Sequence, residues 1–169
     1  RPELLLELGS AELRLGTPRS VEHLGAAVEL IREPQQLATS VRLLANALTM
    51  TGHADRAVKA IESAIEVVGA DDRELSLRLE AELAAHAQHA SLETRARAGS
   101  RLERYRDLNG ATAGERFVLA NLAYQRARAS ESAPPDTAHV TAVGAGGKSH
   151  LASRAAIASL TRLTVRVRR

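Results

Sequence analysis

The sequence predicts an all-α fold made of tandem antiparallel helix pairs, and three observations support this prediction. Hydrophobic residues make up 44% of the 169-residue chain and aromatic residues only 2%, which favours closely packed aliphatic helices over a sheet rich in aromatic side chains. Apolar residues recur at intervals of three and four, as at Val21, Leu24 and Val28, which is the stripe of a core-facing helix. Short Gly/Pro turns separate runs of roughly 12–17 residues, a spacing that favours antiparallel neighbours.

Four helices are expected in the first half of the chain, each bounded by Pro or Gly. Proline suits the first turn of a helix because its missing N–H would have no partner there, and glycine commonly follows the last turn. Thr17 before Pro18 predicts a side-chain cap for the second helix. The expected boundaries are Pro2 to Gly16, Thr17 to Glu33, residues 35–51 before Gly52, and the residues after Gly52 up to Gly69.

Three more helices are expected in the second half. Asp71 with Glu74 predicts a capping box, and Ser91 predicts another side-chain cap. Glu–Arg pairs four residues apart, Glu74 with Arg78 and Glu93 with Arg97, predict solvated helix faces. The expected spans are a helix through Leu75, Leu79 and Leu83, a helix from Ser91 to Leu108, a loop bracketed by Gly110 and Gly114, and a helix from Glu115 to about Ala129.

Composition divides the chain after these helices, because Pro134-Pro135 ends regular structure. We expect a helical repeat domain over residues 1–132, followed over residues 133–169 by a Gly-rich linker and basic tail that is poorly ordered or forms a short helix. No acidic residue follows Asp136, and the six basic residues there carry +6; subtracting this from the overall +3 leaves residues 1–136 at −3. A body that is mildly acidic gives no electrostatic support for DNA binding.

An internal repeat relates the first two helix pairs. Leu8, Gly9 and Gly16 recur 36 residues later as Leu44, Ala45 and Gly52, and Val21, Leu24 and Ala27 recur 37 residues later as Val58, Ile61 and Ala64. A third copy is weaker, with Glu80 where a small residue is expected. Small residues allow close helix approach, and each pair needs a neighbour on both sides. The residues expected to pack between repeats are Gly9, Ala27, Leu44, Ala45, Leu48, Gly52, Ala57, Ile61 and Ala64.

Residues 44–66 resemble a tetratricopeptide motif, with Leu44, Ala45 and Leu48 on its first helix and Gly52 at its turn. The leucine-rich pairs over residues 1–130 resemble the helical-repeat region of large LuxR-type ATP-binding transcriptional regulators. The resemblance implies a right-handed solenoid in the middle of a longer bacterial protein. It also implies that ATP and DNA are bound elsewhere in that protein, by a nucleotide-binding module before the repeats and a helix-turn-helix after them.

One segment has the pattern of a phosphate-binding loop. Residues 142–149 end in Gly147, Lys148 and Ser149, and in such loops backbone N–H groups and a lysine hold the phosphates. No Asp or Glu follows to orient magnesium, and the 20 remaining residues are too few for the sheet that holds such a loop. We therefore expect no cofactor site in this segment.

No other pattern predicts catalysis or a metal centre. His86 and His89 are three residues apart, but no third ligand has suitable spacing, so we expect ordinary surface histidines. No Gly-x-Ser-x-Gly turn is present to hold a nucleophile. The sequence lacks Cys and any apolar run of about 18 residues, so we expect a cytoplasmic protein that does not act on membranes.

Three functions follow from these observations. The first is a non-catalytic scaffold or sensor segment of a LuxR-type regulator, which binds a protein partner or small effector and contacts other domains of the same chain. In this reading DNA is contacted only through a helix-turn-helix outside this segment. The second is a repeat adaptor that binds peptides in a concave groove, unconnected with transcription. The third is an NTPase fragment that uses the loop at residues 142–149.

The loop can be tested by nucleotide titration. We expect magnesium ATP to show no saturable binding at physiological salt, because the loop lacks the carboxylate and sheet that complete such a site. Calorimetry with the full chain measures this directly. A dissociation constant in the micromolar range that is abolished by Lys148→Ala would contradict the expectation and favour the third function.

Overall fold

The computed structural model describes residues 1–69 and 72–132, and these residues form seven α-helices and one 3-10 helix with no strand among them. The prediction of an all-α fold is confirmed for this range. Two compact units divide the chain, Arg1–Arg128 and Ala129–Arg169, and the first holds six helices and most of the seventh. The helices are α1 Pro2–Arg14, α2 Ser20–Leu30, α3 Pro34–Met50, α4 Ala54–Val68, α5 Arg73–Ala87, α6 Leu92–Leu102, the 3-10 helix η1 Glu103–Tyr105 and α7 Ala113–Ser132.

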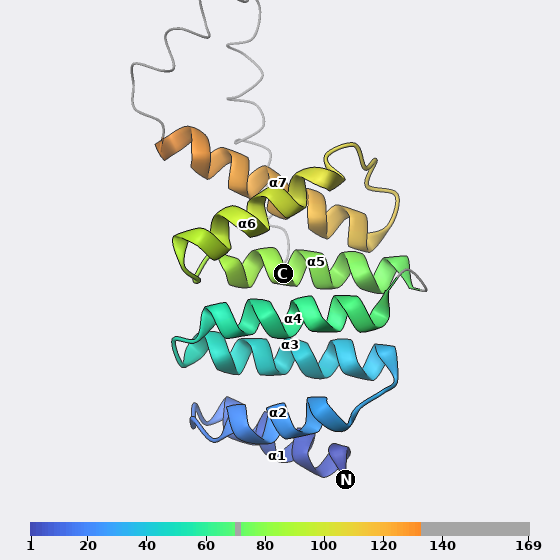
Figure 1. Ribbon diagram of the computed structural model, residues 1–169, viewed down its shortest axis with the longest axis vertical. Helices are drawn as coiled ribbons and strands as arrows, with labels where there is room; N and C mark the ends of the chain where they lie inside the picture. Colours follow the sequence, from blue (N-terminus) through green and yellow to red (C-terminus); the bar gives the residue numbers. More distant parts are fainter. Residues whose placement is uncertain (70–71, 133–169) are drawn as a thin grey trace, which may run out of the picture. The chain divides into compact units, whose positions relative to one another are not determined.

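Consecutive helices of the first unit pack side by side. Each helix from α1 to α5 contacts the helix that follows it in the chain. Figure 1 shows these helices as a row in which the chain turns back at each short connection. Two contacts skip a helix, because α1 touches α3 and α3 touches α5. The odd-numbered helices therefore form a second line of contacts, and α3 is packed on several sides at once.

Aliphatic residues and alanine form the core in two clusters. The larger cluster extends from α2 to Ala98 of α6, and Leu6 and Leu13 of α1 pack against it. A smaller cluster joins α5, α6 and α7 through residues such as Leu77, Leu102 and Val118. None of the helices that the structure describes combines the length and apolar content needed to cross a bilayer.

The residues expected between repeats are buried, apart from Gly52. Gly52 lies in the exposed turn after α3 with a φ of 80°, a conformation that side chains with a Cβ rarely adopt. Gly9 lies against α2 so closely that a Cβ there would be 2.7 Å from Cγ of Leu24. The buried members are Gly9, Ala27, Leu44, Ala45, Leu48, Ala57, Ile61 and Ala64.

The prediction that Thr17 caps the second helix is wrong. Helix α2 begins at Ser20, and no side chain caps its first turn. The Thr17 hydroxyl instead donates to the carbonyl oxygen of Glu12 at 3.1 Å. The same carbonyl also accepts from the backbone N–H groups of Leu15 and Thr17, so the Thr17 hydroxyl adds to the end of α1 instead of capping α2.

The predicted capping box of the fifth helix is also wrong. Asp72 is the cap, and its Oδ1 accepts a hydrogen bond from the backbone N–H of Leu75 at 2.9 Å; Asp71 lies outside the described residues. Glu74 then falls one position too early to complete the box. Its carboxylate accepts from the backbone N–H of Gly114 instead, at 2.7 Å.

Helix α6 begins at the predicted cap, because Ser91 Oγ accepts from the backbone N–H of Thr94. It ends at Leu102, earlier than the predicted Leu108, and the chain continues through η1. Leu102, Tyr105 and Leu108 all pack in the smaller core cluster. A spacing of three brings side chains to the same side of a 3-10 turn, so this apolar pattern favours 3-10 geometry after Leu102.

Two glycines provide a matched test of helix approach. We expect Gly9→Ala to lower the free energy of unfolding by about 1–3 kcal/mol, because the added methyl group overlaps the fully buried Leu24. Gly25→Ala, in the interior of α2 where a Cβ meets nothing within 4 Å, should raise it by about 0.5–1 kcal/mol. Urea denaturation measures both. Equal effects of the two substitutions would contradict a close approach at Gly9.

Candidate functional site

A hollow of about 390 Å³ lies between α3, α5 and α7, within the usual size range of ligand pockets. Its apolar walls include Ala38 of α3 and Leu75 and Leu79 of α5, all buried. Phe117 of α7 adds an aromatic ring that is exposed. Three helices that are separate in sequence therefore contribute to one concave apolar site.

Charged groups surround this apolar surface. Arg42 of α3 is exposed and makes no hydrogen bond or ion pair with another residue that the structure describes. Arg78 of α5 donates from Nε to Glu74 Oε1 at 3.1 Å. Burial raises the pKa of Glu82, although the positive charge of Arg42 acts in the opposite direction. The pocket therefore combines two guanidinium groups with a carboxyl group that ionises less readily than usual.

Neutral polar groups add hydrogen-bonding capacity. Gln35 and Asn121 line the pocket with side-chain amides. The Asn121 amide nitrogen donates to the Phe117 carbonyl at 3.0 Å, and an amide carbonyl oxygen accepts hydrogen bonds. Backbone amides of an extended peptide, or the polar groups of a small effector, match such a lining.

The position of α7 depends on a close approach at Gly114. The Gly114 N–H donates to Glu74 Oε1, and a Cβ at this position would lie 2.9 Å from Cβ of Leu77. Hydrogen bonds from Thr112 and from the Gly114 N–H, together with Arg78, hold the pKa of Glu74 below its usual value. The start of α7 is thus held on α5 by a carboxylate at close range, and this places Phe117 at the pocket.

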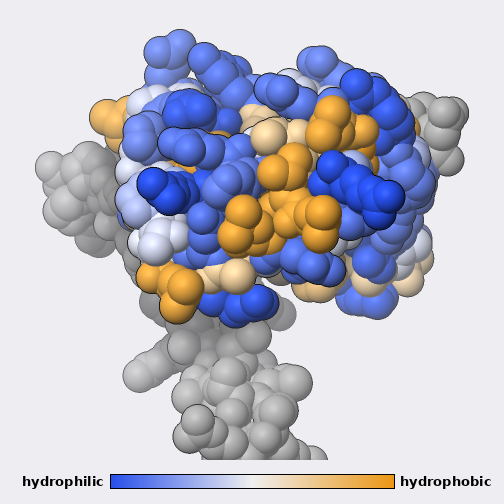
Figure 2. All heavy atoms as spheres, turned by 90° about the horizontal axis from the view of Figure 1, so that it is seen from below, coloured by the Kyte–Doolittle hydropathy of each residue, from blue (hydrophilic) through white to orange (hydrophobic). Residues whose placement is uncertain are grey.

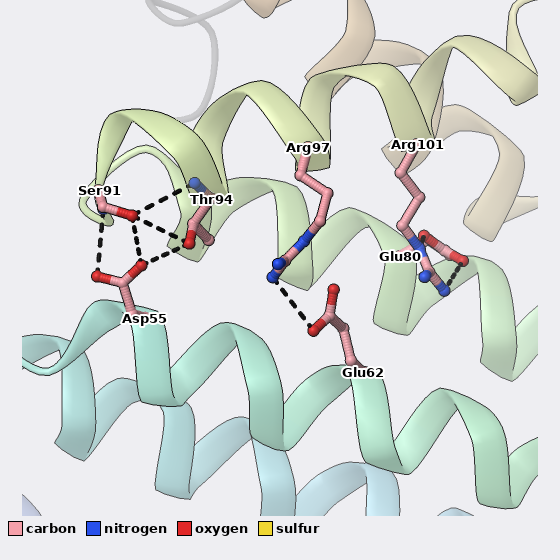
Figure 3. A network of polar contacts seen from close by, with 7 residues as sticks. All are labelled: Asp55, Glu62, Glu80, Ser91, Thr94, Arg97 and Arg101. Carbon is pink, nitrogen blue, oxygen red and sulfur yellow. Dashed lines mark hydrogen bonds and ion pairs between the residues drawn. The ribbon is translucent and has the colours of Figure 1, made fainter.

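Helix α6 is attached to its neighbours by polar contacts, which Figure 3 shows as a row along its lower side. Asp55 of α4 accepts hydrogen bonds from Ser91 Oγ at 2.7 Å and Thr94 Oγ1 at 2.5 Å. The hydrogen bond from Thr94, followed by that from Ser91, holds the pKa of the Asp55 carboxyl below its usual value. The cap residue of α6 therefore also fixes that helix to α4.

Arg97 continues this row by lying 3.5 Å from a carboxylate oxygen of Glu62 on α4. The predicted ion pair between Glu93 and Arg97 is not formed. The predicted pair between Glu74 and Arg78 is present. A long arginine on α6 reaches across to α4 because the two helices lie within range of each other, which sequence spacing within α6 does not reveal.

Glu80 explains the weak third copy of the repeat. It is only 2% exposed, and Arg101 donates to its two oxygens at 2.6 and 2.7 Å. The Tyr105 hydroxyl donates to the same carboxylate at 3.1 Å. A large acidic residue is accepted at this position because α6 and η1 supply a bidentate partner and a hydroxyl, so the buried charge is fully paired.

His86 differs from its predicted place at the surface. It is buried, with Nδ1 2.8 Å from Thr49 Oγ1 and Nε2 3.9 Å from Glu82 Oε2. Burial, and to a lesser extent the charge of His89, lowers the pKa of His86. The prediction of a surface residue is correct for His89 and wrong for His86, because α3 covers that side of α5. Within residues 1–69 and 72–132, no three His, Asp or Glu side chains form a group that could hold a metal ion.

Sequence reasoning did not find the pocket residues. The predicted repeat-packing residues lie in the core, apart from the exposed Gly52, and none of them lines the pocket. Gly147, Lys148 and Ser149 lie outside the described residues. Two signals were present in the sequence. Phe117 is the single phenylalanine of an aliphatic chain, and Arg42 is the single charged residue between Pro34 and Met50.

Comparison of the chain with protein-family models, curated proteins and solved structures finds no significant match. The fold of the described residues defines the class of the protein as all-α. Because no comparison tests it, the resemblance of the chain to LuxR-type regulators stays a prediction.

The buried histidine predicts how stability depends on pH. The pKa of His86 is lower in the folded chain than its ordinary value of 6.5, so the unfolded chain takes up a proton first as the pH falls. The contribution of His86 to the free energy of unfolding should therefore be fully present above about pH 6.5 and decline below it. Glu82, whose pKa is raised by burial, acts with the opposite sign, because the folded chain takes up that proton more readily than the unfolded chain.

Urea midpoints at about pH 7.5 and about pH 5.5 measure this effect. We expect the midpoint to be lower at the acidic pH, and His86→Gln to reduce the difference. The exposed His53 is the matched control, and His53→Gln should leave the difference unchanged. A midpoint equally sensitive to pH in both variants would show that another group is responsible.

Proposed function

We propose that this chain is a non-catalytic interaction segment, which binds a protein partner or small effector in the pocket between α3, α5 and α7. The observation that carries the proposal is Arg42, which lies beside an apolar hollow and makes no hydrogen bond or ion pair with the described part of the chain. A charged group at a concave apolar site orients a ligand, whereas apolar walls supply most of the affinity.

The lining favours a ligand that has an anionic group next to an apolar one. Arg42 and Arg78 provide guanidinium groups suited to a carboxylate or phosphate. Phe117 and the leucines of α5 suit an aliphatic or aromatic group. A short acidic peptide segment and a small organic acid both fit this description, and the volume suits one or two side chains rather than a folded surface.

The proposal includes a tetratricopeptide-like solenoid within a cytoplasmic regulator of LuxR type. The packing of α1 on α3 and of α3 on α5 supports a repeated arrangement, as do the buried small residues at Gly9 and Ala45. In such a regulator, ligand binding to the helices would be relayed to ATP-binding and DNA-binding domains of the same protein. The complete reading frame tests this part, since a frame without either domain would favour a peptide-binding adaptor.

Selection from a random peptide library on the full chain tests the pocket. We expect enriched peptides to carry an acidic residue beside an aliphatic or aromatic one. Arg42→Ala should weaken their binding by about tenfold, or about 1.4 kcal/mol, in fluorescence anisotropy. Arg56→Ala removes an exposed arginine of α4 that does not line the pocket, and should leave the affinity unchanged.

Melting curves of both variants keep the result interpretable, because neither arginine contributes to the core. Peptides that bind equally to Arg42→Ala and to the unchanged chain would use another surface. That result would contradict the proposed site.

A further inference from the structure

Helix α1 carries an exposed apolar stripe at one end of the helix row. Leu4, Leu8 and Leu15 are 62%, 46% and 78% exposed, and Ala11 is half-buried. Figure 2, which views the molecule from the end where α1 lies, shows apolar side chains gathered in the middle of this face and polar residues around them. We call Leu4, Leu8, Ala11 and Leu15 the α1 stripe.

The α1 stripe follows helical periodicity, because its spacings of four, three and four keep the side chains on one side of α1. A different side of the same helix carries Leu6 and Leu13, which pack against the main core. Helix α1 therefore has two apolar sides, of which one is covered by the rest of the chain and one is not.

The second helix pair shows what covers the equivalent side. At the repeat offset of 36 residues, Leu4, Leu8 and Ala11 correspond to Ser40, Leu44 and Ala47 of α3. These are 1%, 8% and 1% exposed. The three α3 residues lie on the side of that helix away from Ala38 and Arg42, which line the hollow shared with α5, and α3 is also packed against α2. We infer that α2 covers this side of α3.

The charges beside the α1 stripe indicate an orientation for its partner. Glu3 and Glu7 are exposed on the first half of α1 and Arg14 on its second half. None of the three forms an ion pair with another described residue. An antiparallel helix would bring its last turn to Glu3 and Glu7 and its first turn to Arg14. Basic residues favour the last turn of a helix and acidic residues the first, so the charges complement an antiparallel helix.

We propose that the α1 stripe is a docking surface for an amphipathic helix, bound antiparallel to α1, that has the apolar pattern of α2 together with an acidic first turn and a basic last turn. Such a helix has aliphatic residues around a central small residue, as α2 has Leu24 and Val28 beside Ala27. The partner covers Leu4, Leu8 and Leu15 as α2 covers the corresponding side of α3. This surface is separate from the pocket, and neither proposal depends on the other.

The probe is a peptide that copies residues 17–33 with Glu29→Arg, because α2 has Glu22 in its first turn but no basic residue in its last turn. Ala26→Lys and Leu30→Glu, at two exposed positions of α2, allow a lactam bridge that holds the labelled peptide helical. We expect saturable binding to the full chain in fluorescence anisotropy, and no binding by the same peptide with Leu24→Asp, which removes its central leucine. In the chain, Leu8→Glu should weaken binding at least about tenfold.

Leu92→Glu is the matched control, because Leu92 is exposed on α6, distant in sequence from the stripe. It should leave the affinity unchanged. A peptide that binds equally to the Leu8→Glu variant would be replacing α2 within the chain, and this would overturn the proposal. Absence of saturable binding would overturn it too. Sedimentation that shows a dimer dissociated by Leu8→Glu would assign the stripe to a second copy instead.

Discussion

The contact between a small residue on one helix and a large aliphatic residue on the next is the constraint on which the helix row depends. Gly9 against Leu24 is its clearest example, because no Cβ fits between them. With so few aromatic side chains, the core has little bulk to fill wide gaps, and helices must approach closely to exclude water. Alanines such as Ala45 and Ala64 extend the same packing along the row.

Helix α6 adds polar contacts to this apolar packing. Ala98 and Leu102 pack in the two core clusters, and Asp55, Glu62 and Glu80 pair with polar side chains of α6. Removing one partner of the buried Glu80 would leave an uncompensated charge, which is far more destabilising than the pair is stabilising. Such contacts specify one arrangement of α6, and the chain beyond it reaches α5 again at Gly114.

The pocket and the α1 stripe use different means of recognition. The pocket exists because α7 returns to α5, which adds Phe117 and Asn121 to walls made by α3 and α5. It presents charged groups around an apolar hollow. The α1 stripe is a single helix side whose equivalent in the next helix pair is buried. If both proposals hold, the two surfaces would allow the chain to connect two partners without movement of its core.

Seven helices, most of their boundaries and the small residues between them could be predicted from the amino-acid pattern, because hydrophobic periodicity and the positions of Gly and Pro are local properties of the chain. Long-range packing sets the rest. Where His86 lies and what pairs with Glu80 depend on residues far away in sequence. The pocket likewise joins Arg42 to Phe117 across 75 positions of the chain, and no local pattern encodes such a meeting.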